Sequence, residues 1–396
     1  MSNPNRDVYI LSFARTPIGS FGGALSSMTA SQLGSKAISA ALERAGLSTE
    51  DVQEVFMGNV LSAGQGQAPA KQASLGAGIP NTVPATTVNK VCASGMKSMM
   101  LGAQSIMLGD NDIVVCGGME SMSNVPYYLP SGRFGQRLGH GKMTDGVIFD
   151  GLWDPYNDCH MGNAGDLCAK ECGFSREDQD EYAVNSYKRA AAAWDSGYFD
   201  DEVVAVEIPQ RKGDPVRVER DEDYTKVKFE KVPSLRPAFA KDGTVTAANA
   251  SSLNDGAAAC VLISGERLEA MGLTAVAKIR SFADASQAPE WFTTTPAKAM
   301  PKALAKAGVE AAEIDAWEIN EAFSVVALAN AKELNLNLDD VNVFGGAVSI
   351  GHPIGCSGAR IVGTLLSVLK QRDAKLGCAG ICNGGGGASA MVLERI

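Results

Sequence analysis

The hydrophobic pattern predicts alternating helices and strands from the start of the chain. Residues 30–46 have helical periodicity, because Leu33, Ile38 and Leu42 fall on one face and Gly46 follows as a C-cap. A second helix is expected over 93–108, and strands are expected at four short apolar runs, at 8–13, 54–60, 85–90 and 113–116. Alternation of this kind is typical of an α/β fold.

A similar order of elements recurs after residue 272. Strands are predicted at 275–282 and 316–319, and helices at 297–307 and 358–369. The segment Ala41-Leu-Glu-Arg-Ala-Gly46 resembles Ala303-Leu-Ala-Lys-Ala-Gly308, and each is followed by acidic residues and a short apolar strand. Two homologous α/β halves are therefore predicted.

Residues 121–249 differ in character and interrupt the first half. They hold most of the tyrosines, irregular stretches rich in proline and glycine, and a charged patch at 211–231. Long insertions of this kind usually carry substrate contacts. We therefore expect an N-terminal half formed by 1–120 and 250–271, an inserted loop domain at 121–249, and a C-terminal half at 272–396.

The charge balance limits the classes of partner. The 396 residues carry a net charge of −10, and the sequence pI is about 5.0. With no long basic run, a nucleic-acid-binding surface is not expected. No apolar run approaches the ~20 residues of a membrane span, so no membrane partner is expected either. A phosphorylated small molecule remains compatible, since it needs only a local cluster of Lys and Arg.

The nine cysteines favour free thiols in a reducing compartment, because their number is odd and no secretory signal precedes them. The first predicted strand begins at Val8, and the last residues are not a peroxisomal address. A cytoplasmic protein is expected, or a mitochondrial one if a presequence has been removed. The pairs Cys168/Cys172 and Cys378/Cys382 lack the spacing of zinc sites.

Cys92 lies in Asn89-Lys-Val-Cys-Ala-Ser-Gly-Met96, where a predicted strand gives way to a predicted helix. A thiol there meets the positive end of the helix dipole and unpaired N–H groups, which are expected to lower its pKa and favour a nucleophilic thiolate. The small residues that follow leave space for an acyl group. On this motif alone, a cysteine that is merely buried and packed explains the sequence equally well.

His352 is one of only three histidines and lies in Gly345-Gly-Ala-Val-Ser-Ile-Gly-His-Pro-Ile-Gly-Cys-Ser-Gly-Ala359, at another strand-to-helix turn. A structural histidine rarely stands among so many glycines. A neutral imidazole placed against a thiol is the usual way to activate the thiol. We therefore expect His352 to be catalytic.

Two further motifs follow short strands of the second half. Cys382 lies in Ile381-Cys-Asn-Gly-Gly-Gly-Gly-Ala-Ser-Ala390, where no Lys-Ser/Thr pair completes a nucleotide-binding loop. The glycines instead let backbone N–H groups point into a cavity, as an oxyanion hole requires. Asn320, in Asn320-Glu-Ala-Phe323, stands at the carboxyl end of a strand, where α/β folds place function, although such an Asn is more often a helix cap.

Together these motifs resemble the thiolase family, and the resemblance runs from Arg15-Thr-Pro-Ile-Gly19 to the C-terminal glycines. It implies a five-layered αβαβα sandwich of two duplicated halves with an inserted loop domain. Two other members of this wider group fit less well. A non-catalytic lipid-binding member has no need of an intact Cys92, His352 and Cys382, and ketoacyl synthases use a second histidine where this chain has Cys382.

The resemblance also implies a role for each motif. Cys92 carries an acetyl group, His352 activates it, and Cys382 takes a proton from the methyl group of a second acetyl-CoA. His352 and a water held by Asn320 stabilise the enolate oxygen, while the N–H groups of Cys92 and Gly384 hold the acyl oxyanion. A Claisen condensation of this kind needs no metal or redox cofactor, so coenzyme A is expected only as substrate and product.

His160-Met-Gly162 resembles the short-chain members that make or cleave acetoacetyl-CoA. The resemblance therefore implies an acetyl-CoA C-acetyltransferase that interconverts two acetyl-CoA with acetoacetyl-CoA and CoA. The alternative is a broader-range 3-ketoacyl-CoA thiolase of fatty-acid degradation, whose members generally lack this histidine. Phe292 matches a residue that faces an α-methyl group in some relatives, but Thr293 replaces the proline that follows it there.

The remaining substrate contacts are implied by the match to the family. Ser251 ends the segment Thr244-Val-Thr-Ala-Ala-Asn-Ala-Ser251, which matches the pantetheine segment. The nucleotide end of CoA is assigned to a basic patch in an acidic chain, namely Tyr187, Lys226, Val227, Lys228 and Lys231. Acyl-side contacts are assigned to His160, Met161, Phe239, Phe292, Ala322 and Phe323.

Two further expectations come from the same resemblance. Tyr187, Ala247, Ala248, Ala250 and Val348 match the carbonyl cage of the potassium-dependent members. Backbone carbonyls come from any residue type, so the residue types barely test this assignment. A homotetramer is the habit of the short-chain members and is expected here.

Overall fold

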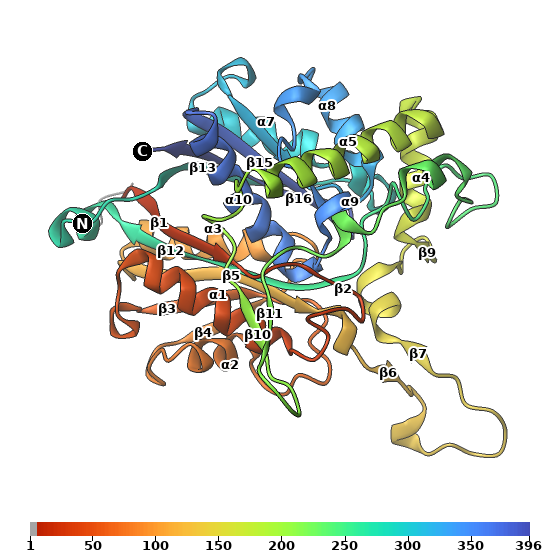
Figure 1. The fold of residues 1–396 in the computed structure, drawn as a ribbon, viewed down its shortest axis with the longest axis horizontal. Coiled ribbons are helices and arrows are strands. Elements are labelled where there is room, and N and C mark those ends of the chain that lie inside the picture. The colour runs from red at the N-terminus through yellow and green to blue at the C-terminus, as the bar shows by residue number, and fades with distance from the viewer. Residues whose placement is uncertain (1–5) are drawn as a thin grey trace.

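One mixed sheet of ten strands runs through the computed structural model, which describes residues 6–396 (Figure 1). Its strands are β1 (Val8–Arg15), β2 (Gly19–Ser20), β3 (Glu54–Gly58), β4 (Ala85–Val88), β5 (Ile113–Ser121), β12 (Asn254–Ser264), β13 (Ala277–Ser286), β14 (Ala316–Ile319), β15 (Leu376–Asn383) and β16 (Gly387–Arg395). Their order is β14-β15-β16-β13-β1-β12-β5-β3-β4, with β2 paired to β12. Residues 1–5, which bear on the expectation that no leader precedes the first strand, lie outside the described residues.

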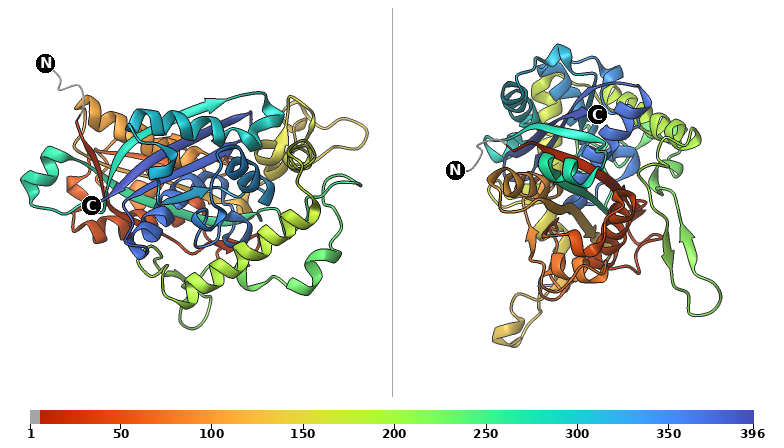
Figure 2. Two further views of the ribbon diagram at one scale, coloured as in Figure 1. Left: turned by 90° about the horizontal axis from the view of Figure 1, so that it is seen from above. Right: turned by 90° about the vertical axis from the view of Figure 1, so that its left-hand side faces the viewer.

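Helices lie on both outer faces of the sheet and between its two halves (Figures 1 and 2). The helices of the two halves are α1 (Ala30–Ala45), α2 (Pro69–Gly76), α3 (Ser94–Leu108), α6 (Gly265–Met271), α7 (Pro296–Ala307), α8 (Ser324–Glu333), α9 (Ala347–Ile350) and α10 (Ile354–Gln371). Helices α1 and α2 cover the N-terminal strands, and α7 and α8 cover the C-terminal strands. Helices α3 and α10 pack on each other in the central layer. The predicted α/β sandwich is therefore confirmed.

Local sequence signals account for most of these elements, as α1 illustrates. Thr29 and Gln32 form a capping box, in which each side chain accepts a hydrogen bond from the other residue's backbone N–H. Gly46 ends the helix at φ 65°, a conformation that costs glycine little. The predicted face of Leu33, Ile38 and Leu42 is buried in the outer core of the N-terminal half.

The two halves repeat one another in detail. The strand order β3-β5-β12-β1 of the first half matches β14-β15-β16-β13 of the second. Both first strands carry an irregularity in register just before a serine, and these serines make the same contact. The Ser12 hydroxyl donates to the Ala41 carbonyl at 2.6 Å, and the Ser281 hydroxyl donates to the Ala303 carbonyl at 2.6 Å. Ala41 and Ala303 begin the two similar segments found in the sequence, so these contacts support the predicted duplication.

The connection from β5 to β12 contains the region predicted as an inserted domain. It holds the helices α4 (Met161–Cys172) and α5 (Arg176–Asp195) and three short hairpins, β6 (Tyr127–Tyr128) with β7 (Thr144–Asp145), β8 (Trp153–Asp154) with β9 (Cys159–His160), and β10 (Val206–Ile208) with β11 (Val216–Val218). Helix α5 packs on α8 and α9, and α4 packs on α8. The boundaries at 121, 249 and 272 stay predictions.

Several elements differ from the expected bounds, and for two of them the reason is the same. Strand β5 continues through Gly118 to Ser121, and α10 begins at Ile354 rather than at 358. In both places, glycine allows close packing instead of forming a loop. A Cβ on Gly118 would lie 2.0 Å from the Gly355 carbonyl, and one on Gly358 would lie 2.5 Å from the Met96 nitrogen. Glycines that suggest a loop in the sequence are thus required where the central helices meet the strands and each other.

Candidate active site

Cys92 lies on a strained turn between β4 and α3. Val91 has a φ of +48°, a left-handed conformation that a β-branched residue rarely adopts. The Ser94 hydroxyl donates to the Val91 carbonyl at 2.6 Å and accepts from the Lys90 N–H at 2.8 Å. The turn therefore holds the half-buried Cys92 thiol directly ahead of the first turn of α3.

The Cys92 thiol is protonated in the resting site. Burial raises its pKa to about 11, although the N–H groups of Gly384 and of Cys92 itself act on the sulfur in the opposite direction. The expectation of a lowered pKa at this helix terminus is wrong, because lost hydration outweighs the helix dipole. Both N–H groups assigned to the oxyanion hole nevertheless act at this sulfur.

His352 is buried and uncharged. Burial, followed by the nearby Arg360 guanidinium, lowers its pKa to about 3. Its Nδ1 lies 2.6 Å from the Ser357 hydroxyl, which also lies 3.0 Å from the Pro353 carbonyl. A carbonyl only accepts, and the hydroxyl has one proton. Both contacts are therefore satisfied when Ser357 donates to Pro353 and the Nδ1–H of His352 donates to Ser357.

This tautomer leaves the lone pair of His352 on Nε2. That atom is buried and has no hydrogen-bond partner among residues 6–396. The His352 N–H donates to Asn254 Oδ1 at 2.8 Å, which fixes the loop. Cys92 packs against the apolar cluster that contains Ile354, two residues after His352. A neutral imidazole with a free Nε2 is the form that accepts a proton from a thiol.

Cys382 and Asn320 reach the same place from two parallel neighbouring strands. Asn320 directly follows β14, its N–H donates to the Gly380 carbonyl of β15 at 3.0 Å, and Cys382 lies two residues further along β15. Burial, and then the charge of Cys92, raise the pKa of the Cys382 thiol well above its usual value. The two sulfurs therefore lie close enough that ionising one disfavours ionising the other.

The Asn320 amide is the other unusual polar group of the site. Asn320 is 1 % exposed, yet neither its Oδ1 nor its Nδ2 has a hydrogen-bond partner in the described part of the chain. Buried amides are nearly always paired, so this one is suited to a water or a substrate oxygen.

All six residues assigned to the acyl side lie together in the structure. The His160 ring stacks on Phe239 at 4.6 Å, and Phe239 meets Phe323 edge-on at 6.2 Å. Met161, Phe239, Phe292, Ala322 and Phe323 belong to the apolar cluster that contains Cys382. A Cβ on Gly384 would lie 3.6 Å from Met161 Sδ and 3.6 Å from Val91 Cγ1, so Met161 adjoins the turn that carries Cys92.

All five residues assigned to the nucleotide end of CoA line one cavity of about 320 Å³. The assigned residues in it are Tyr187, Lys226, Val227, Lys228 and Lys231, joined by Ala247 and Ala248. The Lys226 ammonium binds the Ser20 hydroxyl and Glu222 Oε1, at 2.5 and 2.9 Å. In the described chain Lys228 and Lys231 form no ion pair, so their charges are free for phosphates.

The residues assigned to a potassium cage are only partly brought together. Tyr187, Ala247 and Ala248 line the cavity, and Val348 belongs to the same small apolar cluster as Tyr187. Ala250 is not one of the lining residues, and its backbone pairs with Phe323. Within residues 6–396 no group of three His, Cys, Asp or Glu side chains is arranged to hold a metal ion.

Ser251 connects the cavity to the acyl side. Its N–H donates to the Ala322 carbonyl at 3.0 Å, while the next residue, Ser252, lines the cavity and donates to Asp223 Oδ2 at 2.6 Å. Ser251 and Ser252 therefore mark a route from the basic cavity to the residues assigned to the acyl side.

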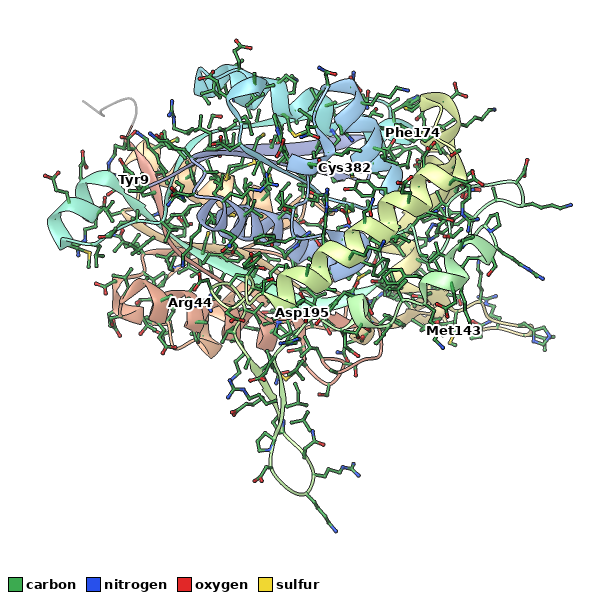
Figure 3. The ribbon with its side chains drawn as sticks, turned by 45° about the horizontal axis from the view of Figure 1, so that its top comes forward. Tyr9, Arg44, Met143, Phe174, Asp195 and Cys382 are labelled. Carbon is green, nitrogen blue, oxygen red and sulfur yellow. The ribbon has the colours of Figure 1, made fainter. Side chains whose placement is uncertain are left out.

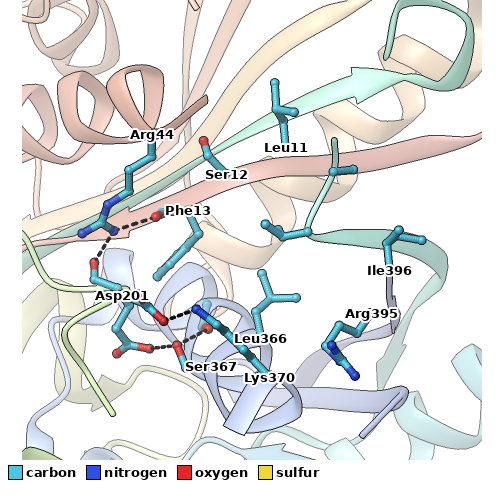
Figure 4. A pocket seen from close by; sticks show the side chains of 14 residues that line it. Leu11, Ser12, Phe13, Arg44, Asp201, Leu366, Ser367, Lys370, Arg395 and Ile396 are labelled. Atoms are coloured by element: carbon cyan, nitrogen blue, oxygen red, sulfur yellow. Dashed lines mark hydrogen bonds and ion pairs between the residues drawn. The ribbon is translucent and has the colours of Figure 1, made fainter. Parts of the chain in front are cut away.

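A larger cavity, of about 400 Å³, lies between β1, α10 and the C-terminus and contains none of the predicted site residues (Figure 4). Its cations are already engaged. Arg44 donates to the Phe13 carbonyl at 2.8 Å, and Lys370 pairs with Asp201. Arg395, the third lining cation, pairs with Asp373.

Several residues around the site have no signal in the sequence. Ser357 and Val91 lie within the two motifs, but their roles depend on a tautomer and on a backbone angle. Asn254, which binds the His352 loop, and Asp223, which receives Ser252, are distant in sequence from the motifs that they contact. Only the fold brings them to the site.

Family profiles match nearly the whole chain. The profile of the thiolase N-terminal domain matches residues 8–266, and that of the thiolase C-terminal domain matches residues 273–395. The chain belongs to the thiolase family. No helix within residues 6–396 is long and apolar enough to cross a membrane.

The similar proteins include acetyl-CoA acetyltransferases along their full length. The cytosolic acetyl-CoA acetyltransferase of Gibberella zeae is 60 % identical over 98 % of both chains. Acetyl-CoA acetyltransferase 2 of Arabidopsis thaliana is 59 % identical over 100 % of this chain and 98 % of its own. The crystal structure of the Acat5 thiolase of Ascaris suum in complex with coenzyme A superposes with a TM-score of 0.94 at 46 % identity, and the match covers 99 % of this chain and 100 % of that one.

The low pKa of His352 makes a testable contribution to stability. Between pH ~6.5 and pH ~3 the unfolded chain protonates this histidine and the folded chain does not, so stability is lost as the pH falls through that window. From pH 7 to pH 5 the loss is about 2 kcal/mol. His352→Gln lacks this titrating group. Its free energy of unfolding should therefore fall by about 2 kcal/mol less between pH 7 and pH 5 than that of the wild type.

Urea unfolding of both proteins at pH 7 and pH 5 measures this difference. Each protein is compared with itself, so a constant cost of the substitution cancels. An identical pH dependence in the two proteins contradicts the assignment.

Proposed function

We propose that this chain is an acetyl-CoA C-acetyltransferase that works through an acetyl group on Cys92. The observation that carries the proposal is the convergence of four groups from both halves. These are the Cys92 thiol, the Gly384 N–H that acts on its sulfur, the buried Cys382, and a neutral His352 with a free Nε2. The names of the full-length relatives support the same activity.

In the first half-reaction, His352 Nε2 takes the Cys92 proton as the sulfur attacks the thioester carbonyl of acetyl-CoA. The carbonyl oxygen becomes an oxyanion next to the N–H groups of Cys92 and Gly384, which are already in place. The C–S bond to CoA breaks, and the departing thiolate takes the proton of Cys382. The site then holds acetyl-Cys92, a His352 cation and a Cys382 thiolate, and free CoA has formed.

In the second half-reaction, the Cys382 thiolate removes a methyl proton from a new acetyl-CoA. Burial makes this thiolate a strong base, as a weakly acidic C–H requires. The His352 cation and a water held by the unpaired Asn320 amide stabilise the enolate oxygen. The enolate attacks acetyl-Cys92, acetoacetyl-CoA leaves, and the Cys92 sulfur recovers the proton from His352. Thiolysis is the same sequence in reverse, and no cofactor is consumed.

The CoA moiety is proposed to bind along the route described above. The ammonium groups of Lys228 and Lys231 suit its phosphates, with Lys226, Tyr187 and Val227 completing the cavity. Ser251 lies beside the pantetheine on the way to Cys92. The CoA bound in the Ascaris suum thiolase supports a CoA site in this fold.

The exposed arm at residues 127–149 supports a proposed homotetramer. The side chain of Phe134 is 86 % exposed, and Leu138, Met143 and Phe149 are also exposed, so an apolar arm extends from the molecule (Figures 1 and 3). Exposed apolar patches of this kind usually mark association surfaces. Light scattering in solution tests the assembly, and a monomeric mass contradicts it.

Cytoplasmic location is proposed as well. Among the relatives, the Gibberella zeae enzyme is named cytosolic and the Danio rerio enzyme is named mitochondrial, so family membership alone leaves both open. The identity is higher to the cytosolic enzyme, at 60 % against 55 %. Fractionation of source cells tests this proposal, and recovery with mitochondria contradicts it.

Mixing the protein with acetyl-CoA should acetylate one peptide, the one that contains Cys92. Cys92→Ala should abolish acetylation, because the acyl carrier is gone. Cys382→Ser should keep the acetylation, because a CoA thiolate is stable enough to leave before it gains a proton. The variant should lose condensation by at least ~100-fold, since an alcohol is a far poorer base than a thiolate. Intact-mass spectrometry and a condensation assay measure the two steps separately. An adduct on Cys382, or equal loss of both steps in Cys382→Ser, contradicts the roles.

The packed rings of His160, Phe239 and Phe323 beside Met161 should limit the acyl group to four carbons. A pocket discriminates one methyl group by only ~1–3 kcal/mol, or about 10–200-fold. We expect kcat/KM for thiolysis to be highest for acetoacetyl-CoA, lower for 2-methylacetoacetyl-CoA, and very low for six-carbon or longer 3-ketoacyl-CoA. A preference for long chains favours the broader-range 3-ketoacyl-CoA thiolase instead.

Potassium should raise activity by ordering the backbone near Ser251. The proximity of Tyr187, Ala247, Ala248 and Val348 supports such a cage. Lower KM for acetyl-CoA in potassium than in sodium, at equal ionic strength and with unchanged kcat, is the expected result. Equal KM in both salts removes the ion from the scheme.

A further inference from the structure

Lys90, two residues before Cys92, extends across the boundary between the two halves. Its ammonium donates to Asp284 Oδ1 at 2.5 Å, to the Ser389 hydroxyl at 2.7 Å and to the Ala388 carbonyl at 3.2 Å. All three partners belong to the C-terminal half, on β13 and β16. One side chain of the Cys92 turn therefore uses all three of its donors on the opposite half.

Asp284 binds one residue that precedes Cys92 and one that follows it. Its Oδ1 accepts from Lys90 and, at 2.7 Å, from the Ser389 hydroxyl, while its Oδ2 accepts from Lys97 on α3 at 2.8 Å. Burial opposes ionisation, but Lys90, Lys97 and Ser389 outweigh it and lower the pKa of Asp284 to about 2. The carboxylate is thus charged at every working pH and bridges a residue before Cys92 to a residue after it.

The partners of Lys90 lie next to the second catalytic sulfur. In the pairing of β15 with β16, Ala388 is directly opposite Cys382, and Asp284 is directly opposite Ser389 in the pairing of β13 with β16. Lys90 therefore fixes the Cys92 turn to the residue that faces Cys382. The distance between the two sulfurs depends on this connection.

The turn needs such a restraint for two reasons. Val91, between Lys90 and Cys92, has a φ of +48°, and a residue in this region stays there only when its surroundings hold it. The halves also share few hydrogen-bonded strand pairs, since β1 and β13 pair only at Tyr9 with Lys278 and at Ile10 with Ala277. Relative movement of the halves would separate Cys92 from the Gly384 N–H.

We propose that Lys90 and Asp284 are positioning residues that set Cys92 against the C-terminal half of the site. They touch neither substrate nor reacting atoms, and they act by holding Cys92 where the Gly384 N–H and Cys382 can serve it. This inference rests on the proposed acetyl transfer to Cys92.

Lys90→Met removes the ammonium and keeps the aliphatic stem. The single-turnover rate of Cys92 acetylation by acetyl-CoA should fall at least ~10-fold, because a displacement near 1 Å can cost up to ~100-fold in rate. The dissociation constant for CoA should stay within about twofold, since no CoA contact is lost. Lys90→Arg, which keeps the charge and several donors, should recover most of the rate.

Lys278→Met is the matched control. Lys278 lies on the same strand as Asp284 and pairs with Asp7 at 2.6 Å, and its side chain is 26 % exposed against 24 % for Lys90. The Lys278→Met substitution removes an equivalent ion pair far from the Cys92 turn. The acetylation rate of this variant should stay within about twofold of the wild-type rate. Circular dichroism at the assay temperature confirms that each variant is folded.

The outcomes separate the two proposals. If the wild type forms no acetyl-Cys92, the proposed function fails. If the wild type is acetylated and Lys90→Met is acetylated equally fast, only the positioning role fails. An equal loss in Lys278→Met also overturns the positioning role, because it attributes the effect to the general loss of an ion pair. No recovery in Lys90→Arg overturns it as well, because the retained charge and donors should restore the contact with Asp284.

Discussion

The close approach of α3 and α10 is the constraint on which the rest of the site depends. A Cβ on Gly58 would lie 2.6 Å from the Gly95 nitrogen and 2.7 Å from the Gly355 carbonyl, and one on Gly95 would lie 2.7 Å from the Ala359 nitrogen. With no side chains between them, the first turns of the two central helices touch through their backbones. Cys92 and His352 precede these two turns, so the contact that packs the core also sets the proposed nucleophile near its proposed base.

Burial, and not local helix chemistry, decides the charge state of the site. The same enclosure raises the pKa of Cys92 to about 11 and lowers that of His352 to about 3. Both groups are neutral at rest, and charge appears only when substrate arrives and a proton moves. A thiol that stays protonated until then is a poor target for stray electrophiles and oxidants.

Local features of the sequence predict local structure well and tertiary effects poorly. The bounds of α1 follow from apolar spacing and from Gly46, both of which act within a few residues. Each of the four motif residues is expected from the sequence at the end of a strand, but His352 instead follows the short helix α9, Ala347–Ile350, so the strand predicted before it is wrong. The depressed pKa expected for Cys92 was wrong because hydration depends on the whole fold. Lys90 and Asp284 are 194 positions apart in the chain, and no local pattern relates them.

The repetition of the two halves has a consequence for the residues at their equivalent turns. Helix α3 follows β4 and precedes β5, and α10 stands in the equivalent place before β15, so Cys92 and His352 occupy corresponding turns of the two copies. A symmetric pair of identical chains would present the same residue at both turns. Because both copies belong to one chain, each turn carries its own residue, so one can hold the proposed nucleophile and the other the proposed base.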